Sequence, residues 1–203
     1  MMAERKLKKL FEPLPDKQFD VIYADPPWNY RDGGKTRTGA AERYYPTLTL
    51  KQLGTLPVET IANRNCALLM WTTGPKMDEA LELMKLWGFV YKTIFFNWVK
   101  TTPSTGEPKC GLGNYTRSST EICLLGVRGN VCTNLKKACN VQQTILSPAG
   151  RHSEKPLEAK ERIEAFFGPK ASKIELFSRT RAFTPLWTVW GNEAVKNESS
   201  SSK

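Results

Sequence analysis

The chain has 203 residues, of which 40% are hydrophobic and 25% charged, and this balance is typical of one globular domain rather than of a disordered or fibrous chain. Thirty Lys and Arg residues against twenty Asp and Glu residues give a net charge of +10. This charge favours a polyanionic partner, although a merely soluble basic protein is the alternative. Apolar runs such as residues 66–71 are far shorter than the roughly 18 residues that span a membrane.

The basic N-terminus is not followed by the apolar segment of a signal peptide. The five cysteines include no CxxC pair, so they indicate neither a disulfide framework nor a zinc site. We therefore expect a soluble cytoplasmic protein with reduced thiols, without a membrane partner and without a metal.

Strand and helix signals alternate along the chain. The apolar run over residues 19–24 ends at a carboxylate and two prolines, as a buried strand does, and apolar residues recur at helical spacing between Pro75 and Trp87. We expect strands over residues 19–24, 67–72, 89–99, 121–127, 173–177 and 187–190, and helices over residues 75–87 and 154–167. The alternation predicts a single α/β domain with a mostly parallel sheet and helices on both faces. In such a sheet, ligands bind beyond the carboxyl ends of the strands.

The tetrapeptide Asp25-Pro26-Pro27-Trp28 stands at such an end, directly after the first strand. Two prolines fix the backbone and remove two donors, so the Asp25 carboxylate and the Pro26 carbonyl form two rigid acceptors, with Trp28 as a flat apolar face beside them. The exocyclic amine of a nucleobase, which has two N–H donors and a ring that stacks, suits such a site. The alternative is an ordinary turn in which Asp25 caps the next element and Trp28 belongs to the core.

Six further motifs follow in order: WTTG (71–74), LWGF (86–89), WVK (98–100), RHSEKP (151–156), IELFSR (174–179) and WGN (190–192). Together with DPPW they resemble the DPPW-type adenine-N6 methyltransferase family, which includes the catalytic subunit of the mRNA adenosine methyltransferase and small bacterial and phage enzymes. The resemblance implies a Rossmann-like fold that uses S-adenosylmethionine. It also implies a methyltransferase domain over residues 19–193, between a basic N-terminal segment (1–18) and a disordered tail (194–203).

The resemblance assigns roles to individual residues. It makes Asp25, Pro26, Pro27 and Trp28 catalytic, with Asp25 also at the cofactor. Lys155, in the first turn of the predicted helix over residues 154–167, would hold the cofactor carboxylate, and the free N–H groups of that same turn fit the role although the helix dipole disfavours a cation there; the alternative is a solvated surface lysine. Arg179 would contact the ribose, and Asn192 and Glu193 the adenine side.

Two basic, glycine-containing loops, residues 29–46 and 101–117, are the segments available for substrate. The resemblance makes the first a gate over the target base, and the second is suited to contacting phosphates or reading bases. The alternative for both is a solvated surface loop. The residues expected to contact nucleic acid are Tyr30, Tyr45, Lys100 and Arg117.

The sequence thus predicts a site-specific, S-adenosylmethionine-dependent DNA adenine-N6 methyltransferase of a prokaryotic or phage-infected cell. The adenine would be flipped out, or taken from single-stranded substrate, with its N6 held by Asp25 and Pro26, so that catalysis is mainly positioning and Asp25 need not be a strong base. Compactness and likeness to bacterial and phage members favour DNA. RNA N6-adenosine methylation, N4-cytosine methylation and a catalytically silent nucleic-acid-binding subunit are the alternatives, and both a homodimer and a partner subunit are compatible with the sequence.

Overall fold

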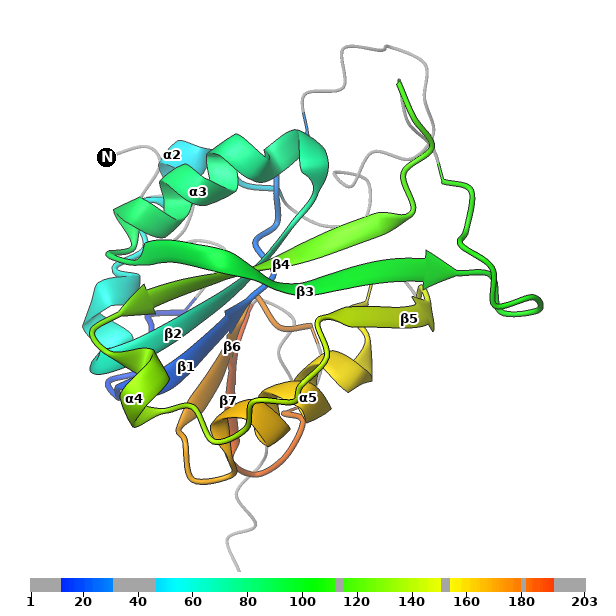
Figure 1. The fold of residues 1–203 in the computed structure, drawn as a ribbon. Helices are drawn as coiled ribbons and strands as arrows, with labels where there is room; N and C mark the ends of the chain where they lie inside the picture. The colour runs from blue at the N-terminus through cyan, green and yellow to red at the C-terminus, as the bar shows by residue number, and fades with distance from the viewer. Residues whose placement is uncertain (1–11, 31–46, 112–114, 151–153, 180–181, 192–203) are drawn as a thin grey trace, which may run out of the picture.

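A sheet of seven strands runs through the computed structural model, which describes residues 12–30, 47–111, 115–150, 154–179 and 182–191 (Figure 1). The strands are β1 (Phe19–Ala24), β2 (Ala62–Thr72), β3 (Val90–Thr101), β4 (Thr120–Arg128), β5 (Thr144–Pro148), β6 (Lys173–Leu176) and β7 (Trp187–Trp190). Their order in the sheet is β5-β3-β4-β2-β1-β6-β7, and β4 alone among these strands pairs antiparallel with its neighbours. The predicted α/β fold with a mostly parallel sheet is therefore confirmed.

The direction of β4 decides which residues meet at the functional edge. The described part of the connection from β3 to β4 contains no helix, so the chain turns back and β4 runs against β3 (Figure 1). The amino end of β4 therefore lies at the same edge as the carboxyl ends of the other six strands. Side chains that precede or begin β4 can thus meet side chains that follow β1, β5 and β6.

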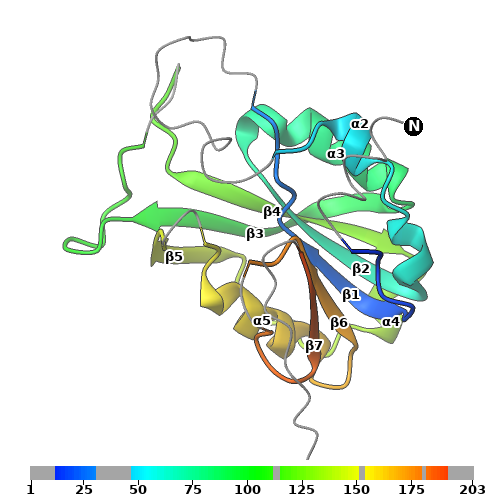
Figure 2. The ribbon, with the colours of Figure 1, turned by 180° about the vertical axis from the view of Figure 1, so that it is seen from behind.

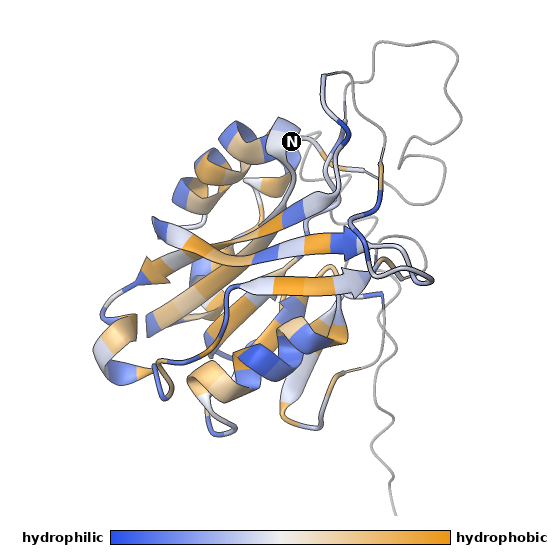
Figure 3. Cartoon of the chain, turned by 45° about the vertical axis from the view of Figure 1, so that its right-hand side comes forward, coloured by the Kyte–Doolittle hydropathy of each residue, from blue (hydrophilic) through white to orange (hydrophobic). Residues whose placement is uncertain are grey.

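Two helices cover the two faces of the sheet. Figures 1 and 2 show α3 (Met77–Leu86) on one side and α5 (Leu157–Phe167) on the other. Successive side chains of β1 alternate between these layers: Ile22 packs in the core cluster of α3, whereas Val21 and Tyr23 pack in the cluster of α5. Figure 3 shows hydrophilic residues on the solvent side of α5. Burial on both faces explains why β1 reads as a continuous apolar run.

The remaining helical elements are single turns: α2 (Leu50–Leu53), η2 (Val58–Ile61), η3 (Gly74–Lys76) and α4 (Val131–Asn134). Within the described part of the chain, no helix combines the length and the apolar character needed to cross a membrane. All five cysteines are described and none is in a disulfide; Cys66 and Cys123 are buried.

Three departures from the predicted strands and helices have a clear physical reason. β2 begins at Ala62, five residues earlier than expected, because residues 63–65 of its first half are polar and only partly buried or exposed. β5 was not predicted, since Ile145 is its single fully buried residue. α5 begins at Leu157 rather than near residue 154, because Pro156 takes an extended conformation before the first turn.

Candidate active site

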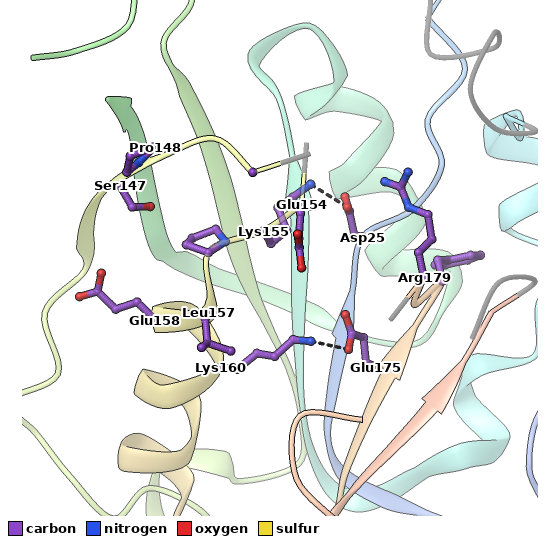
Figure 4. Close-up of a pocket in the computed structure, with 13 residues that line it drawn as sticks. Asp25, Ser147, Pro148, Glu154, Lys155, Leu157, Glu158, Lys160, Glu175 and Arg179 are labelled. Carbon is purple, nitrogen blue, oxygen red and sulfur yellow. Dashed lines mark hydrogen bonds and ion pairs between the residues drawn. The ribbon is translucent and has the colours of Figure 1, made fainter. Parts of the chain in front are cut away.

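A cavity of about 680 Å³ lies at the edge where six strands have their carboxyl ends. Its walls come from the segments after β1, β5 and β6 and from the first turns of α5 (Figure 4). Asp25, Lys155 and Arg179, three of the residues predicted to form the site, line it together. Residues separated by about 130 and 150 positions in sequence are thus brought to one cavity by the parallel strand order.

Four alternating charges form an ion cluster at this cavity. The Lys155 Nζ donates to Asp25 Oδ2 at 2.6 Å and lies 3.1 Å from Glu121 Oε2. The Lys100 Nζ donates to the other oxygen of Glu121. We call Asp25, Lys155, Glu121 and Lys100 the ion cluster. The side chains of Lys155 and Glu121 are only 10% exposed, so the alternative of a solvated surface lysine at position 155 is wrong.

Burial and mutual attraction act in opposite directions on the charges of this cluster. Burial raises the pKa of Asp25 above its ordinary value, and the Glu121 carboxylate raises it further, although Lys155 opposes both. Burial disfavours the charge of Lys155, but Asp25 and Glu121 outweigh it and raise the pKa of its ammonium group. Burial likewise opposes the charge of Glu121, but Lys155 and Lys100 outweigh it and lower the pKa of this carboxyl group. Lys155 and Glu121 are therefore held in their charged forms.

Aromatic residues form the floor under Lys155. Its Nζ lies 5.7 Å from the ring centroid of Trp71, a cation–π distance. The indole N–H of Trp71 donates to the Tyr23 hydroxyl at 2.7 Å, and the indole N–H of Trp28 donates to the Trp71 carbonyl at 3.1 Å. These bonds connect β1, β2 and the DPPW turn, so the lysine rests on a rigid surface.

Both proline carbonyls of the DPPW turn accept backbone hydrogen bonds. The Trp28 N–H donates to the Pro26 carbonyl at 2.8 Å, which closes a three-residue turn, and the Leu48 N–H donates to the Pro27 carbonyl at 2.8 Å. A carbonyl oxygen has two lone pairs, so Pro26 can accept a second donor. The rigid geometry expected of two prolines is therefore present, and the Pro26 carbonyl is already fixed in direction.

Trp28 differs from the sequence expectation. Its side chain belongs to the core cluster that α3 covers, and the residue is 4% exposed. The described structure thus gives Trp28 a buried ring tied by its N–H to Trp71, and not the open apolar face that was expected beside Asp25. Its role in the described structure is to anchor the turn that carries Asp25.

The segment after β6 enters the cavity through a strained residue. Phe177 has a φ of 62°, in the left-handed region that non-glycine residues avoid. Its ring stacks on Trp87 and meets Trp190 edge to face, and these contacts hold the turn. A Cβ added to Gly191 would lie 2.2 Å from the carbonyl oxygen of Ser178, so only glycine fits there. Arg179 comes directly after Ser178 in this segment and reaches the side of the cavity where Asp25 lies (Figure 4).

The opposite wall is built by β5 and α5. Lys160 and Glu175 form an ion pair of 2.7 Å across the cavity (Figure 4).

Lys155 precedes α5, so it is not in the first turn of the helix as expected. The N-terminus of α5 still faces the cavity, because Pro156 and Leu157 line it. Pro156 provides no side-chain cap for this terminus. Backbone N–H groups of the first turn are therefore available beside Lys155.

The residues expected to contact nucleic acid do not share this cavity wall. The Tyr30 hydroxyl lies 2.9 Å from Thr73 Oγ1, with the Lys76 ammonium over its ring. Lys100 is part of the ion cluster, and Arg117 is exposed in the segment between β3 and β4. Tyr45, Asn192, Glu193, most of the first basic loop and the tail lie outside the described residues.

Sequence reasoning missed three residues of the site: Glu175 and Ser147, which line the cavity, and Glu121, which pairs with Lys155. One feature of the sequence could have pointed to Glu121 as a site residue: it is a carboxylate immediately before the apolar run of a predicted strand. Its proximity to Lys155 required the antiparallel direction of β4. Among the described residues, no group of His, Cys, Asp and Glu side chains could hold a metal ion.

Comparisons with known proteins give one consistent result. The model of the MT-A70 family matches residues 19–193. The chain is 38% identical to the type II methyltransferase M.MunI of a Mycoplasma species, over 95% of this chain and 84% of that protein. It is 32% identical to the human N(6)-adenosine-methyltransferase catalytic subunit METTL3 over 87% of this chain, and 32% identical to the human N(6)-adenine-specific methyltransferase METTL4 over 89%. The chain spans 28% of METTL3 and 38% of METTL4.

Proposed function

The chain belongs to the MT-A70 family of N6-adenine methyltransferases, and we propose that it transfers a methyl group from S-adenosylmethionine to N6 of adenine in DNA. One observation carries this proposal: the Asp25 carboxylate, fixed after β1 by two prolines and by Lys155, lies in the wall of the cavity. Its side chain is 30% exposed, so a ligand can reach it.

Asp25 and Pro26 provide the acceptors that an exocyclic amine needs. The lone pair of such an amine is delocalised into the base, so the amine is a poor nucleophile. One N–H group of the amine donates a hydrogen bond to the Asp25 carboxylate, and the other donates to the Pro26 carbonyl. These two hydrogen bonds favour the tetrahedral nitrogen that can attack an electrophile. Positive charge that develops on the nitrogen is then stabilised by the carboxylate. Lys155 favours the ionised form of Asp25 and orients it, and Trp28 keeps the turn in place.

The residues of the cavity fit S-adenosylmethionine. A volume of about 680 Å³ is within the usual range for cofactor sites. The walls combine cations, carboxylates, an uncapped helix terminus and the apolar residue Phe177, which suit an amino-acid group, a ribose and an adenine. When bound, this cofactor supplies an electrophilic methyl group on a sulfonium. We propose that Lys155 and Arg179 contact its carboxylate and ribose, and that Asn192 and Glu193 contact its adenine side.

One observation favours DNA as the substrate, and a second favours a nucleic acid of either kind. M.MunI, a type II methyltransferase, matches this chain over most of the length of both proteins, whereas METTL3 contains this region as 28% of a longer chain. The net charge of +10 suits a polyanion. The likeness to METTL3 makes RNA the second candidate.

The substrate-facing role of the segment between β3 and β4 is a further part of the proposal. This segment extends beyond the edge of the sheet that carries the cavity (Figure 1). Arg117 and Tyr115 are exposed on it. We propose that Arg117 contacts phosphates, whereas Lys100 stabilises Glu121 instead of binding DNA directly.

Nucleoside mass spectrometry tests the proposal. The full chain is incubated with S-adenosylmethionine and, in parallel, with duplex DNA, single-stranded DNA and RNA of one sequence set, and the digested nucleosides are analysed. We expect N6-methyladenine in DNA. A methylated cytosine, or product in RNA alone, would contradict the proposed substrate. Absence of any product together with intact DNA binding would identify a silent binding subunit.

A further inference from the structure

Two aromatic side chains are strongly exposed in the described part of the chain, and one of them stands beyond the edge of the sheet that carries the cavity. Tyr91 is 42% exposed near the start of β3, at the opposite edge, whereas Tyr115 is fully exposed between β3 and β4. A single exposed apolar group does not by itself indicate a partner. The surroundings of Tyr115 therefore have to decide what its ring does.

Tyr115 belongs to an ordered arm rather than to a loose loop. We call residues 101–111 and 115–119 the arm, which extends beyond the edge of the sheet in Figure 1. The Thr102 N–H donates to the Glu107 carbonyl at 2.8 Å. A Cβ added to Gly111 would lie 1.9 Å from the Ser118 carbonyl oxygen, so these two backbones touch. The two limbs of the arm therefore support each other.

The base of the arm is bonded to the ion cluster. The Lys100 N–H donates to the Ser119 carbonyl, and the Lys109 N–H donates to the Lys100 carbonyl, both at 2.7 Å. The side chain of Lys100 pairs with Glu121. Tyr115 is six positions before Glu121, so the two residues are at most about 20 Å apart. One DNA duplex, with a major groove about 12 Å wide, can thus contact the arm and the cavity together.

The charges of the arm favour an anionic partner. Lys109 and Arg117 are exposed on it, against one exposed carboxylate, Glu107. Two such cations suit phosphates, which position a nucleic acid and leave the neighbouring ring to contact bases. An exposed aromatic ring beside exposed cations is the combination by which proteins stack on bases while they follow the backbone.

We propose that Tyr115 stacks between the base pairs of duplex DNA, in the gap that a flipped adenine leaves. Extrusion of a base breaks its stacking on both neighbours. The ring of Trp28 cannot refill the stack, because it belongs to the core. A ring inserted from the arm restores this stacking and keeps the adenine out of the helix, as side chains inserted between base steps do. The inference rests on the proposed function, because it assumes that the target is adenine in DNA.

Methylation of one DNA sequence set as duplex and as single strands tests the inference, because single strands have no base pair to open. We expect Tyr115→Ala to lower the ratio of kcat/KM for duplex to kcat/KM for single strands about tenfold. Tyr115→Phe, which retains the ring, should keep the wild-type ratio. Tyr91→Ala removes an exposed tyrosine at the opposite edge; it is the matched control and should keep the ratio as well.

Fluorescence gives a readout without turnover. 2-Aminopurine replaces the target adenine in a duplex site that the wild type methylates, and its emission rises when the base leaves the stack. At saturating protein, Tyr115→Ala should give a smaller rise than the wild type, whereas Tyr115→Phe and Tyr91→Ala should give the wild-type rise. Because the ring of Tyr115 is fully exposed, Tyr115→Ala should melt at the wild-type temperature.

The possible failures separate the inference from the proposed function. A wild-type ratio or a wild-type fluorescence rise in Tyr115→Ala would overturn the inference and leave the proposed function intact. An equal loss on duplex and single strands would do the same, since it would make Tyr115 a general contact, and so would a wild type that methylates single strands alone. If the wild type methylated no DNA, the proposed function would fail as well.

Discussion

Replacing Glu121 by glutamine removes one negative charge from the middle of the ion cluster and keeps the shape of the side chain. In the structure, Glu121 accepts from Lys100 with one oxygen and faces Lys155 with the other. The amide retains one acceptor, so one of these two contacts becomes a contact with an N–H donor. Lys155 stays paired with Asp25 at 2.6 Å, and Lys100, which loses its carboxylate, has a partly exposed side chain, so neither lysine becomes a fully buried charge without a partner.

The loss of stability follows from these contacts. A hydrogen bond to a charged group contributes about 1.5–3 kcal/mol, and the full cost of about 3–5 kcal/mol for a stranded buried charge does not apply because Asp25 remains. We expect the free energy of unfolding to fall by about 2 kcal/mol and the melting temperature by about 4–8 °C. Because the folded state lowers the pKa of Glu121, its contribution is present above the ordinary value of 4.5 and is lost as the pH falls through the lowered pKa.

The same substitution has a second effect on the pH dependence of activity. Burial and then Glu121 raise the pKa of Asp25, while Lys155 lowers it. Without the charge of Glu121, one of the groups that raise the pKa of Asp25 is lost. Lys155 then faces Asp25 as its one carboxylate partner in the ion cluster. The pKa of Asp25 therefore falls in Glu121→Gln, and the acidic limb of the activity profile moves to lower pH.

The assay is kcat/KM for DNA methylation against pH, restricted to values at which circular dichroism shows a folded variant. Glu175→Gln is the matched control: it breaks the 2.7 Å pair with Lys160 in the same cavity, but Glu175 is not among the groups that mainly set the pKa of Asp25. The control should lose stability and keep the wild-type acidic limb. An acidic limb of Glu121→Gln that is unchanged, or that moves to higher pH, would refute the reasoning.

Three further substitutions test other parts of the structure. Asp25→Asn should lower kcat by about 10²–10³ through loss of the charged acceptor; methyl incorporation at wild-type rate would show that Asp25 is dispensable. Gly191→Ala should lower the free energy of unfolding by about 1–3 kcal/mol, because its Cβ would lie 2.2 Å from the Ser178 oxygen, whereas Gly74→Ala has open space and should melt normally. Arg117→Ala should weaken DNA binding and reduce the slope of log K against log salt by about 1; the slope of exposed Lys170→Ala, the control, should not change.

Elements with a strong local signal were predicted well. β1 and β7 have the bounds expected from their apolar runs, and Gly168 ends α5 with a φ of 80° as a terminating glycine does. β5 escaped prediction because an edge strand with one fully buried residue has no periodic pattern. The turns α2 and α4 escaped because four residues are too few for helical periodicity to appear.

The DPPW motif shows how far local reasoning reaches. Its rigid turn and its place after a buried strand follow from two prolines and an apolar run, and both are present. The burial of Trp28 could not be derived in this way, because it depends on the core cluster that Trp28 forms together with Leu48 and with residues of β2 and α3. Whether an aromatic residue faces a cavity or the core is a property of the packed layers.

The sequence by itself determined the chemistry that is available: an acidic group and a fixed carbonyl at a strand end, a lysine at the start of a helix, and an arginine after another strand. These depend on residue type and on neighbours along the chain. Only the tertiary structure decided how they are used. The antiparallel direction of β4 brings Glu121 to Lys155 across 34 positions, and β5 brings Ser147 to the same cavity. Such pairings are set by strand order and packing, which act over distances in the chain that no local pattern records.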